Sequence, residues 1–236
     1  MNRITTVSIG FMIVGGMLAS NAALARKGGL PQCEEEVLFC LETAQAFPAT
    51  GQTSCWDSTG ALIDCDGTGH DGEIRAGAPL DYTDTGLTII DNNTKLEWMK
   101  QDDNNLLDPL TCDSLPGSLD ADCFFSWDEA FAFVARLNDA EFAGHTDWRV
   151  PNVKELQSIV NYENLPPAVS AEFDTRCVSG CTVEACSCTR AASYWSSTSD
   201  ADGPPTEAWR VAFGSGFVLT SGKTTAIRVR AVRGGL

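Results

Sequence analysis

The sequence predicts an α+β domain of antiparallel strands with two helices, preceded by a cysteine-containing N-terminal extension. Three observations lead to this prediction. A strand hairpin is predicted over residues 87–99, two amphipathic helices are predicted between residues 126 and 160, and the last third of the chain reads as strands. Strands, then helices, then further strands are typical of the α+β class. We place this domain at residues 81–236.

The prediction is centred on residues 144–160, where a glycine turn, a short extended run and a helix follow one another. Pro151 ends the extended run, because its ring fixes φ and it has no N–H to donate. Asn152 is placed to cap the helix, and Glu155 three residues later can reach back to it, as in a capping box. The apolar residues of this helix then form one buried stripe, namely Val153, Leu156, Ile159 and Val160.

Residues 1–25 read as a secretory signal peptide. Arg3 supplies a positive charge, residues 7–19 an apolar run, and residues 23–25 a small-x-small cleavage site. The apolar run is too short for an ordinary membrane span, and an uncleaved anchor is the alternative. No later stretch is apolar enough to cross a bilayer. We therefore expect an exported chain, periplasmic, on the cell surface or secreted, with no transmembrane segment after cleavage.

The chain contains ten cysteines, an even number that indicates a disulfide framework in an exported protein. They are Cys33, Cys40, Cys55, Cys65, Cys112, Cys123, Cys177, Cys181, Cys186 and Cys188. Pairing between neighbours is the simplest hypothesis: Cys33–Cys40, Cys55–Cys65, Cys112–Cys123, and two bridges within residues 177–188. A four-thiolate zinc site in the last group is the alternative, but the spacing and an oxidising compartment favour disulfides.

The net charge of −16 favours cations, including Ca²⁺, and disfavours nucleic acid and anionic membranes as partners. The charge is uneven along the chain. Residues 81–129 carry twelve acids and two lysines, whereas five bases and one acid follow from Pro205 onward. We expect these two regions to neutralise one another in part.

Residues 26–80 form a glycine-rich extension, with a predicted helix at 34–46 and short runs around residues 55–56 and 61–63. Residues 64–73 resemble a calcium loop, but Arg75 stands where an EF-hand needs a bidentate glutamate, so the EF-hand interpretation fails. A looser calcium site remains a hypothesis. Its ligands would be Asp64, Asp66 and Asp71, and the alternative is an acidic, turn-rich linker.

Ser126 and Glu129 predict a capping box at the start of the first long helix. One buried face is predicted for it, made of Trp127, Ala130, Phe131, Val134 and Leu137. An irregular insertion at 161–192 follows the second helix. Strands are then predicted at 194–198, 209–213, 217–220 and 227–233, the last with Arg228 and Arg230 on the opposite face from its apolar residues.

Seven ordered motifs together resemble the Lcl C-terminal domain family, which is named after a collagen-like bacterial adhesin. They lie at residues 85–87, 91–98, 126–130, 147–156, 194–198, 208–209 and 229–233. Residues 47–80 also resemble a cysteine-bearing leader found in many members. The resemblance implies a surface-associated module with a fold related to C-type-lectin-like and sulfatase-modifying-factor domains. Glycosaminoglycan binding by a trimer, as in the adhesin, is not carried over, because this chain lacks a collagen repeat and is strongly acidic.

The leading functional hypothesis is a lectin-like module that recognises a glycan or a surface protein, with calcium as a candidate cofactor. Sugar recognition needs an exposed aromatic face and polar groups beside it. The candidates are Trp195 and Trp209 for the first, and Asp102, Asp103, Asn104, Asp200 and Asp202 for the second.

The alternatives are a structural subunit of a surface assembly and, ranked lower, an oxidoreductase analogous to formylglycine-generating enzymes. The four aspartates among the polar candidates could also supply paired acids for glycoside hydrolysis. We expect no enzyme, because the only histidines are His70 and His145 and neither belongs to a recognisable catalytic set.

Overall fold

The computed structural model describes residues 47–100, 124–164, 166–175, 186–202 and 205–235, all within one compact unit, Gln45–Leu236. The predicted signal peptide, the helix predicted at 34–46 and residues 101–123 lie outside the described residues. In order, the described strands are β1 (Cys55–Trp56), β2 (Leu62–Ile63), β3 (Tyr82–Asp84), β4 (Thr88–Asp91), β5 (Leu96–Met99), β6 (Ser193–Ser199), β7 (Glu207–Ala212), β8 (Phe217–Gly222) and β9 (Val232–Gly234). The α-helices are α3 (Asp71–Ile74), α4 (Trp127–Asp139) and α5 (Val153–Ser158).

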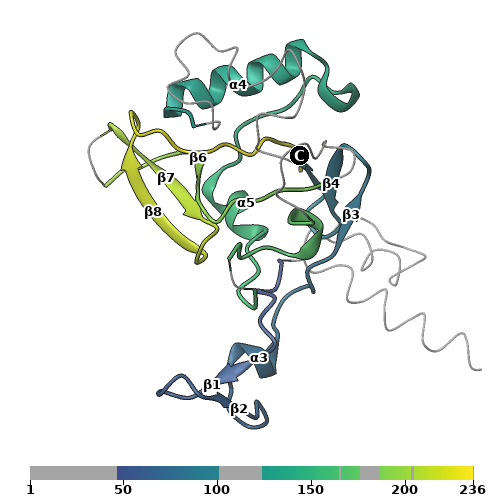
Figure 1. Ribbon diagram of the computed structural model, residues 1–236, viewed down its shortest axis with the longest axis vertical. Coiled ribbons are helices and arrows are strands. Elements are labelled where there is room, and N and C mark those ends of the chain that lie inside the picture. Colours follow the sequence, from purple (N-terminus) through teal and green to yellow (C-terminus); the bar gives the residue numbers. More distant parts are fainter. Residues whose placement is uncertain (1–46, 101–123, 165, 176–185, 203–204, 236) are drawn as a thin grey trace, which may run out of the picture. The chain divides into compact units, whose positions relative to one another are not determined.

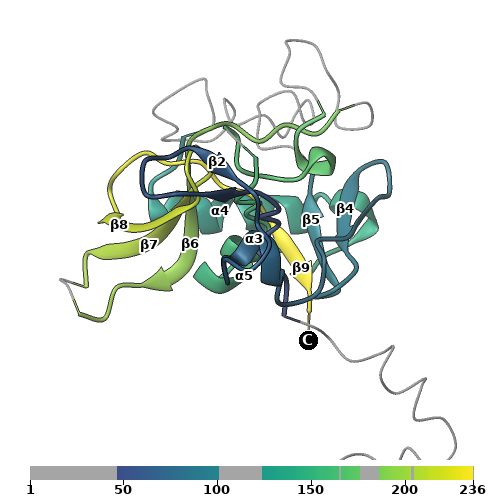
Figure 2. The ribbon, with the colours of Figure 1, turned by 90° about the horizontal axis from the view of Figure 1, so that it is seen from below.

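The strands form three antiparallel sheets, ordered β1-β2, β3-β4-β5-β9 and β6-β7-β8. This arrangement confirms the α+β class and the hairpin predicted over residues 87–99, which is formed by β4 and β5. Figure 2 shows β9 beside β5 in the four-stranded sheet, so residues 232–234 lie against this hairpin.

Two buried clusters lie on either side of β6, and one helix belongs to each (Figure 1). Trp195 packs in the cluster under α4, whereas the preceding residue, Tyr194, packs in the cluster with α5. Successive residues of a strand point to opposite faces, so β6 is covered on both sides.

Both predicted helix starts are confirmed. Ser126 accepts a hydrogen bond from the Glu129 backbone, and the Glu129 side chain accepts one from the Ser126 backbone. Asn152 and Glu155 make the same reciprocal pair at the start of α5. Each box satisfies backbone N–H groups that a helix start would otherwise leave without acceptors.

The predicted face of α4 is wrong at one residue. Phe131 is 37% exposed, and the buried aromatic residue is Phe133, whose ring centroid lies 5.1 Å from that of Phe125. The buried stripe is therefore Ala130, Phe133, Val134 and Leu137.

The strand predicted at 227–233 is regular only over β9. Upstream of it, Ile227 bridges Phe125 and Arg228 bridges Tyr194, so this extended segment passes from one neighbour to another. Its alternation is confirmed, because Ile227, Val229 and Ala231 all pack under α4. The arginine face is nevertheless buried: Arg228 is 8% exposed and Arg230 is fully buried.

Arg230 is held by backbone and hydroxyl oxygens from two distant segments. One guanidinium nitrogen donates to the carbonyls of Met99 and Lys100 at 2.8 and 3.2 Å, and the other donates to Cys188 O and Thr189 Oγ1 at 2.7 Å each. The Phe173 ring lies 5.5 Å from the guanidinium carbon. Arg230 thereby ties the end of β5 to residues 188–189 of the insertion.

Candidate functional site

The aspartates proposed as calcium ligands do not converge. Asp64 Oδ1 accepts a hydrogen bond from the Asp66 backbone at 3.1 Å, and Asp71 accepts one from the Thr50 hydroxyl. Within the described part of the chain, no group of three or more His, Cys, Asp or Glu side chains is placed to hold a metal. The structure thus does not gather Asp64, Asp66 and Asp71 into one group, and the first and last of these carboxylates accept local hydrogen bonds. Calcium binding by these residues stays a prediction.

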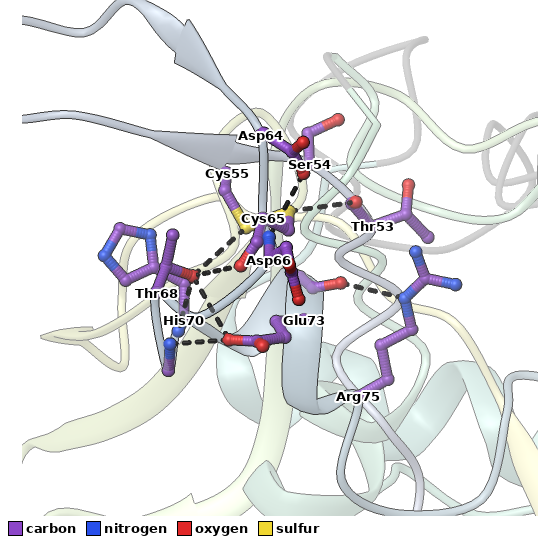
Figure 3. The surroundings of a disulfide bond; sticks show 12 residues. Thr53, Ser54, Cys55, Asp64, Cys65, Asp66, Thr68, His70, Glu73 and Arg75 are labelled. Carbon is purple, nitrogen blue, oxygen red and sulfur yellow. Dashed lines mark hydrogen bonds between the residues drawn. A yellow bond between two sulfur atoms is a disulfide. The ribbon is translucent and has the colours of Figure 1, made fainter.

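Glu73 organises this loop instead (Figure 3). Its carboxylate accepts hydrogen bonds from the Gly69 and Gly67 backbones at 2.6 and 2.8 Å. These two bonds, that from Gly69 first, lower the pKa of Glu73. The sequence pattern assigned the loop's acidic residues to a cation, whereas here a carboxylate closes the loop by accepting backbone N–H groups.

The disulfide predicted between Cys55 and Cys65 is confirmed and lies beside the same loop (Figure 3). Cys186 and Cys188 are disulfide-bonded as well, and no cysteine among the described residues is free. The remaining six cysteines lie outside the described residues: Cys33, Cys40, Cys112, Cys123, Cys177 and Cys181. Their pairing stays a prediction.

A single carboxylate joins the extension to the insertion. Glu163 accepts hydrogen bonds from the Thr53 and Ser54 backbones at 2.7 and 3.0 Å, and from the Ser54 hydroxyl. Tyr162 also donates its backbone N–H to Thr50 O at 2.9 Å. The hydroxyl bond from Ser54 and the backbone bond from Thr53 lower the pKa of Glu163, because they favour its ionised form.

We expect acid to release this junction. Because the pKa of Glu163 is lower in the folded chain than in the unfolded chain, its stabilising contribution is complete above the unfolded-state value and disappears as pH falls through the folded-state value. In an NMR titration, the amide shifts of Thr53 and Ser54 should follow the ionisation of Glu163, on the acid side of the ordinary glutamate range. The variant Glu163→Gln keeps an acceptor without an ionisable group, so the same amides should not titrate there. Equal titration in both proteins would contradict this assignment.

The most distinctive motif, residues 147–156, forms a network of ion pairs. Arg149 makes a two-pronged contact with Glu155, both N–O distances being 2.7 Å, and also donates to Gly234 O at 3.1 Å. Arg233 bridges Asp147 and Glu97. The bond from Arg233 lowers the pKa of the Asp147 carboxyl. These contacts hold β9 against the turn before α5, so the motif positions the chain rather than presenting a reactive group.

His145 lies at the edge of this network, with its Nε2 atom 3.7 Å from Glu97 Oε2. Glu97 is already bonded by Arg233 and by the Thr88 hydroxyl, the latter at 2.6 Å. The other histidine, His70, is the exposed residue that precedes α3. One histidine thus lies beside the ion-pair network and the other lies in the extension.

The predicted ligand residues fall into three groups. Asp102, Asp103 and Asn104 lie outside the described residues. Trp195 is fully buried and donates its indole N–H to Phe125 O at 2.9 Å, which corrects its candidacy, because a covered ring cannot stack on a sugar. Ala208 packs under α4, and Trp209, the next residue, is half-buried and points to the other face of β7.

Asp200 and Asp202 lie together in the loop after β6. Asp200 accepts a hydrogen bond from the Asp202 backbone at 3.0 Å, and its own N–H donates to Glu207 O. Asp202 is exposed and Asp200 is half-buried. Asp200 and Asp202 are thus the two predicted acids that lie together in a described loop.

An aromatic pair at the start of α4 lies against β6, the strand that precedes this loop. The rings of Trp127 and Phe131 meet edge to face with their centroids 4.6 Å apart, and the Trp127 indole donates to Ser196 O at 2.9 Å. Lys223 Nζ lies 4.1 Å from the Trp127 ring centroid and donates to Ser199 Oγ at the end of β6. We call the set Trp127, Phe131, Lys223, Asp200 and Asp202 the Trp127 surface.

Sequence reasoning missed this surface because it assigned Trp127 and Phe131 to the core. Trp127 is in fact half-buried and Phe131 is exposed. The available signal was Phe133: added to the five predicted residues, it widens the apolar side of α4 beyond what one buried face requires. A partly exposed ring pair beside charged groups can contact both the apolar face and the hydroxyl groups of a ligand.

These features define an α+β domain of antiparallel sheets, fixed by an ion-pair network, with a partly exposed aromatic surface. The sequence profile of the Lcl C-terminal domain family matches residues 87–233. The chain belongs to this family, which places it among bacterial surface domains related to an adhesin. No curated protein matches the sequence. None of the described helices is long and apolar enough to cross a membrane.

Proposed function

We propose that the chain is an exported, lectin-like recognition module that binds a surface glycan at the Trp127 surface. The observation that carries this proposal is the partly exposed pair of Trp127 and Phe131 beside Lys223. Carbohydrates present apolar C–H faces and hydroxyl edges, so their binding needs aromatic rings with polar groups next to them. The Trp127 surface supplies both kinds of group.

Three further observations support the proposal. The signal-like N-terminus predicts export, and the Lcl C-terminal domain family is related to a surface adhesin. A C-type-lectin-like arrangement, which the family resemblance implies, is compatible with two short helices packed on antiparallel sheets. The exposed carboxylate of Asp202 is available for a sugar hydroxyl or for Ca²⁺.

Glycan-array binding by the full chain, with and without a calcium chelator, tests the proposal. We expect binding to at least one glycan class and a loss of roughly tenfold or more in affinity for Phe131→Ser and for Asp202→Asn. The control is Ile74→Ser, which removes another exposed apolar side chain, 60% exposed against 37% for Phe131, from α3 and should leave binding unchanged. The chelator arm decides whether Ca²⁺ takes part.

The proposal fails if the folded chain binds no glycan in either condition. It also fails if both Trp127-surface variants bind as the parent does. A mutation effect shared by Ile74→Ser would point to loss of folding, which the thermal midpoint of each variant reports separately.

The second candidate function is a structural subunit of a surface assembly. It is favoured by a different observation, the exposed Trp56 and Leu62 on the β1-β2 hairpin, since exposed apolar pairs commonly mark protein contacts. Recovery of a stable protein complex from the exporting cell, together with no glycan affinity, would favour this function over the first.

A further inference from the structure

The β1-β2 hairpin has one covered face and one open face. On the covered face, Cys55 is bonded to Cys65 and lies against Gly72 of α3, so close that a Cβ atom at Gly72 would lie 2.9 Å from the Cys55 sulfur. On the open face, Trp56 and Leu62 stand directly opposite each other in the register. They are 40% and 70% exposed.

Three exposed carboxylates belong to this hairpin or directly follow it: Asp57 comes after Trp56, and Asp64 and Asp66 come after β2. No lysine or arginine occurs between Phe47 and Ile74, and Arg75 is the next base. Asp57 stays ionised readily, because the Thr59 hydroxyl and the Ala61 backbone donate to its carboxylate and lower its pKa. We call Trp56, Leu62 and these three aspartates the hairpin patch.

A patch of opposite character lies on the three-stranded sheet. Phe217 and Leu219 of β8 are 64% and 39% exposed and point to the same face, because they are two residues apart. Arg210 of β7 stands opposite Leu219 in the register and shares that face. We call Phe217, Leu219 and Arg210 the β8 patch.

The β8 patch lacks the usual protection of a sheet edge. β8 pairs with β7 alone in the described sheet, and its six residues carry no charge and no proline. Natural edge strands are commonly protected by lysine, proline or a bulge, and an unprotected apolar edge invites a partner. The acid in β7, Glu207, is three residues from Arg210, and side chains alternate along a strand, so Glu207 belongs to the other face of the sheet.

We propose that copies of this chain associate head to tail, with the hairpin patch of one copy docked on the β8 patch of the next. The two patches match in chemistry: each presents two exposed apolar side chains, and the three carboxylates of one are opposite in charge to the Arg210 guanidinium of the other. Arg210 is half-buried, and its guanidinium also donates to the neutral hydroxyls of Ser193 and Ser221. In a chain of net charge −16, contact between two identical hairpin patches would bring like charges together and is disfavoured. The complementary surface that the chain itself carries is the β8 patch.

This pairing has a geometrical consequence. Because the two halves of the contact are different surfaces, each bound copy still offers one free half, and the association continues into a ring or a filament. The inference concerns contacts between copies of the protein and holds whether or not the Trp127 surface binds a glycan. Phe217 begins β8, whereas Lys223 of the Trp127 surface comes directly after the last residue of β8, so the two residues lie at opposite ends of the strand.

Sedimentation velocity of the full chain, from low to high micromolar concentration, tests the proposal. We expect the mean mass to rise with concentration beyond that of a dimer. Trp56→Ser and Leu219→Ser should each raise the dissociation constant by about tenfold or more, as loss of a central apolar contact does in other interfaces. Asp66→Lys should weaken association in the same direction, because it reverses one charge of the hairpin patch. Phe47→Ser, at an 87% exposed side chain outside both patches, is the matched control and should associate as the parent does.

Mixing separates head-to-tail docking from every symmetrical arrangement. Trp56→Ser retains an intact β8 patch and Leu219→Ser retains an intact hairpin patch, so an equimolar mixture should form a one-to-one complex that does not grow further. Phe217→Ser replaces Leu219→Ser if the latter loses its cooperative thermal transition. A parent chain that stays monomeric, variants that associate normally, or a mixture that forms no complex would each overturn the proposal.

Discussion

Replacing Arg230 with methionine is expected to lower the free energy of unfolding by about 3–5 kcal/mol, the loss typical when one partner of a buried charged network is removed. The guanidinium is fully buried and serves four oxygen atoms, those of Met99, Lys100, Cys188 and Thr189. Methionine fills much of the volume but donates to none of these oxygens, although Lys100 O still accepts from the Cys188 N–H at 3.3 Å, and buried acceptors that lose a donor are costly. Urea unfolding followed by tryptophan fluorescence measures the change.

Two comparisons make this prediction specific. Arg230→Lys keeps the charge but has no planar fork to reach both segments, so most of the loss should remain. Lys154→Met removes an exposed cation from α5 and should change stability by less than about 0.5 kcal/mol. If Arg230→Met were as stable as Lys154→Met, the oxygens around position 230 would be satisfied in some other way.

Trp148→Ala is expected to cost about 3–5 kcal/mol, as large-to-small changes of buried aromatic residues do. Trp148 is 3% exposed and packs against Phe142, with ring centroids 5.5 Å apart. Its indole donates to Phe142 O at 2.9 Å, and its backbone is bonded in both directions by Asn138 of α4. The residue therefore fixes the end of α4 to the start of the extended run before α5.

Thermal and urea unfolding of Trp148→Ala can be compared with Trp56→Ala, which removes the same side chain from a 40% exposed position. The second variant should lose clearly less, because 40% of the Trp56 surface already meets water, against 3% of the Trp148 surface. Similar losses in the two variants would show that burial does not set the cost at position 148.

Local sequence signals predicted the elements that depend on neighbouring residues alone. The two capping boxes involve residues three apart, and the turn after β4 is set by Asp91, which accepts the N–H groups of Asn93 and Thr94. The Cys55–Cys65 bridge closes a separation of ten residues within one hairpin. In each case the chain holds the partners close before any packing occurs.

Features that depend on distant partners were not predictable in the same way. The alternation around Arg230 was visible, but residues 188–189 that cover it are about forty positions away, as the separation of 42 between Arg230 and Cys188 shows. Trp195 was a candidate for stacking on a sugar, with core packing as the alternative, and its burial followed from helix α4 covering that side of β6. Periodicity gives the face of an element, and only the tertiary structure gives what covers the face.

The candidate site was predicted in part. Asp200 and Asp202 were identified and do lie in one loop, but their aromatic neighbours were assigned to the wrong class of residue. Trp127 belongs to the core and to the surface at once: its indole N–H donates to the backbone of β6, and the Lys223 ammonium lies over its ring. A residue that is half core and half surface gives the same hydrophobic signal as one that is fully buried.

Strand β3 bears on how the domain should be cut for expression. The family match begins at residue 87, whereas Tyr82–Asp84 pairs with β4 and Asp84 neutralises the buried Lys100. A fragment trimmed to the matched residues would lack β3. The backbone groups of β4 that pair with β3 would then be unpaired, and Lys100 would lose the carboxylate of Asp84. The part of the chain to express therefore starts before residue 87, so that it includes β3. We expect a fragment that starts at residue 87 to aggregate because of its exposed strand edge and unpaired Lys100, whatever ligand the domain binds.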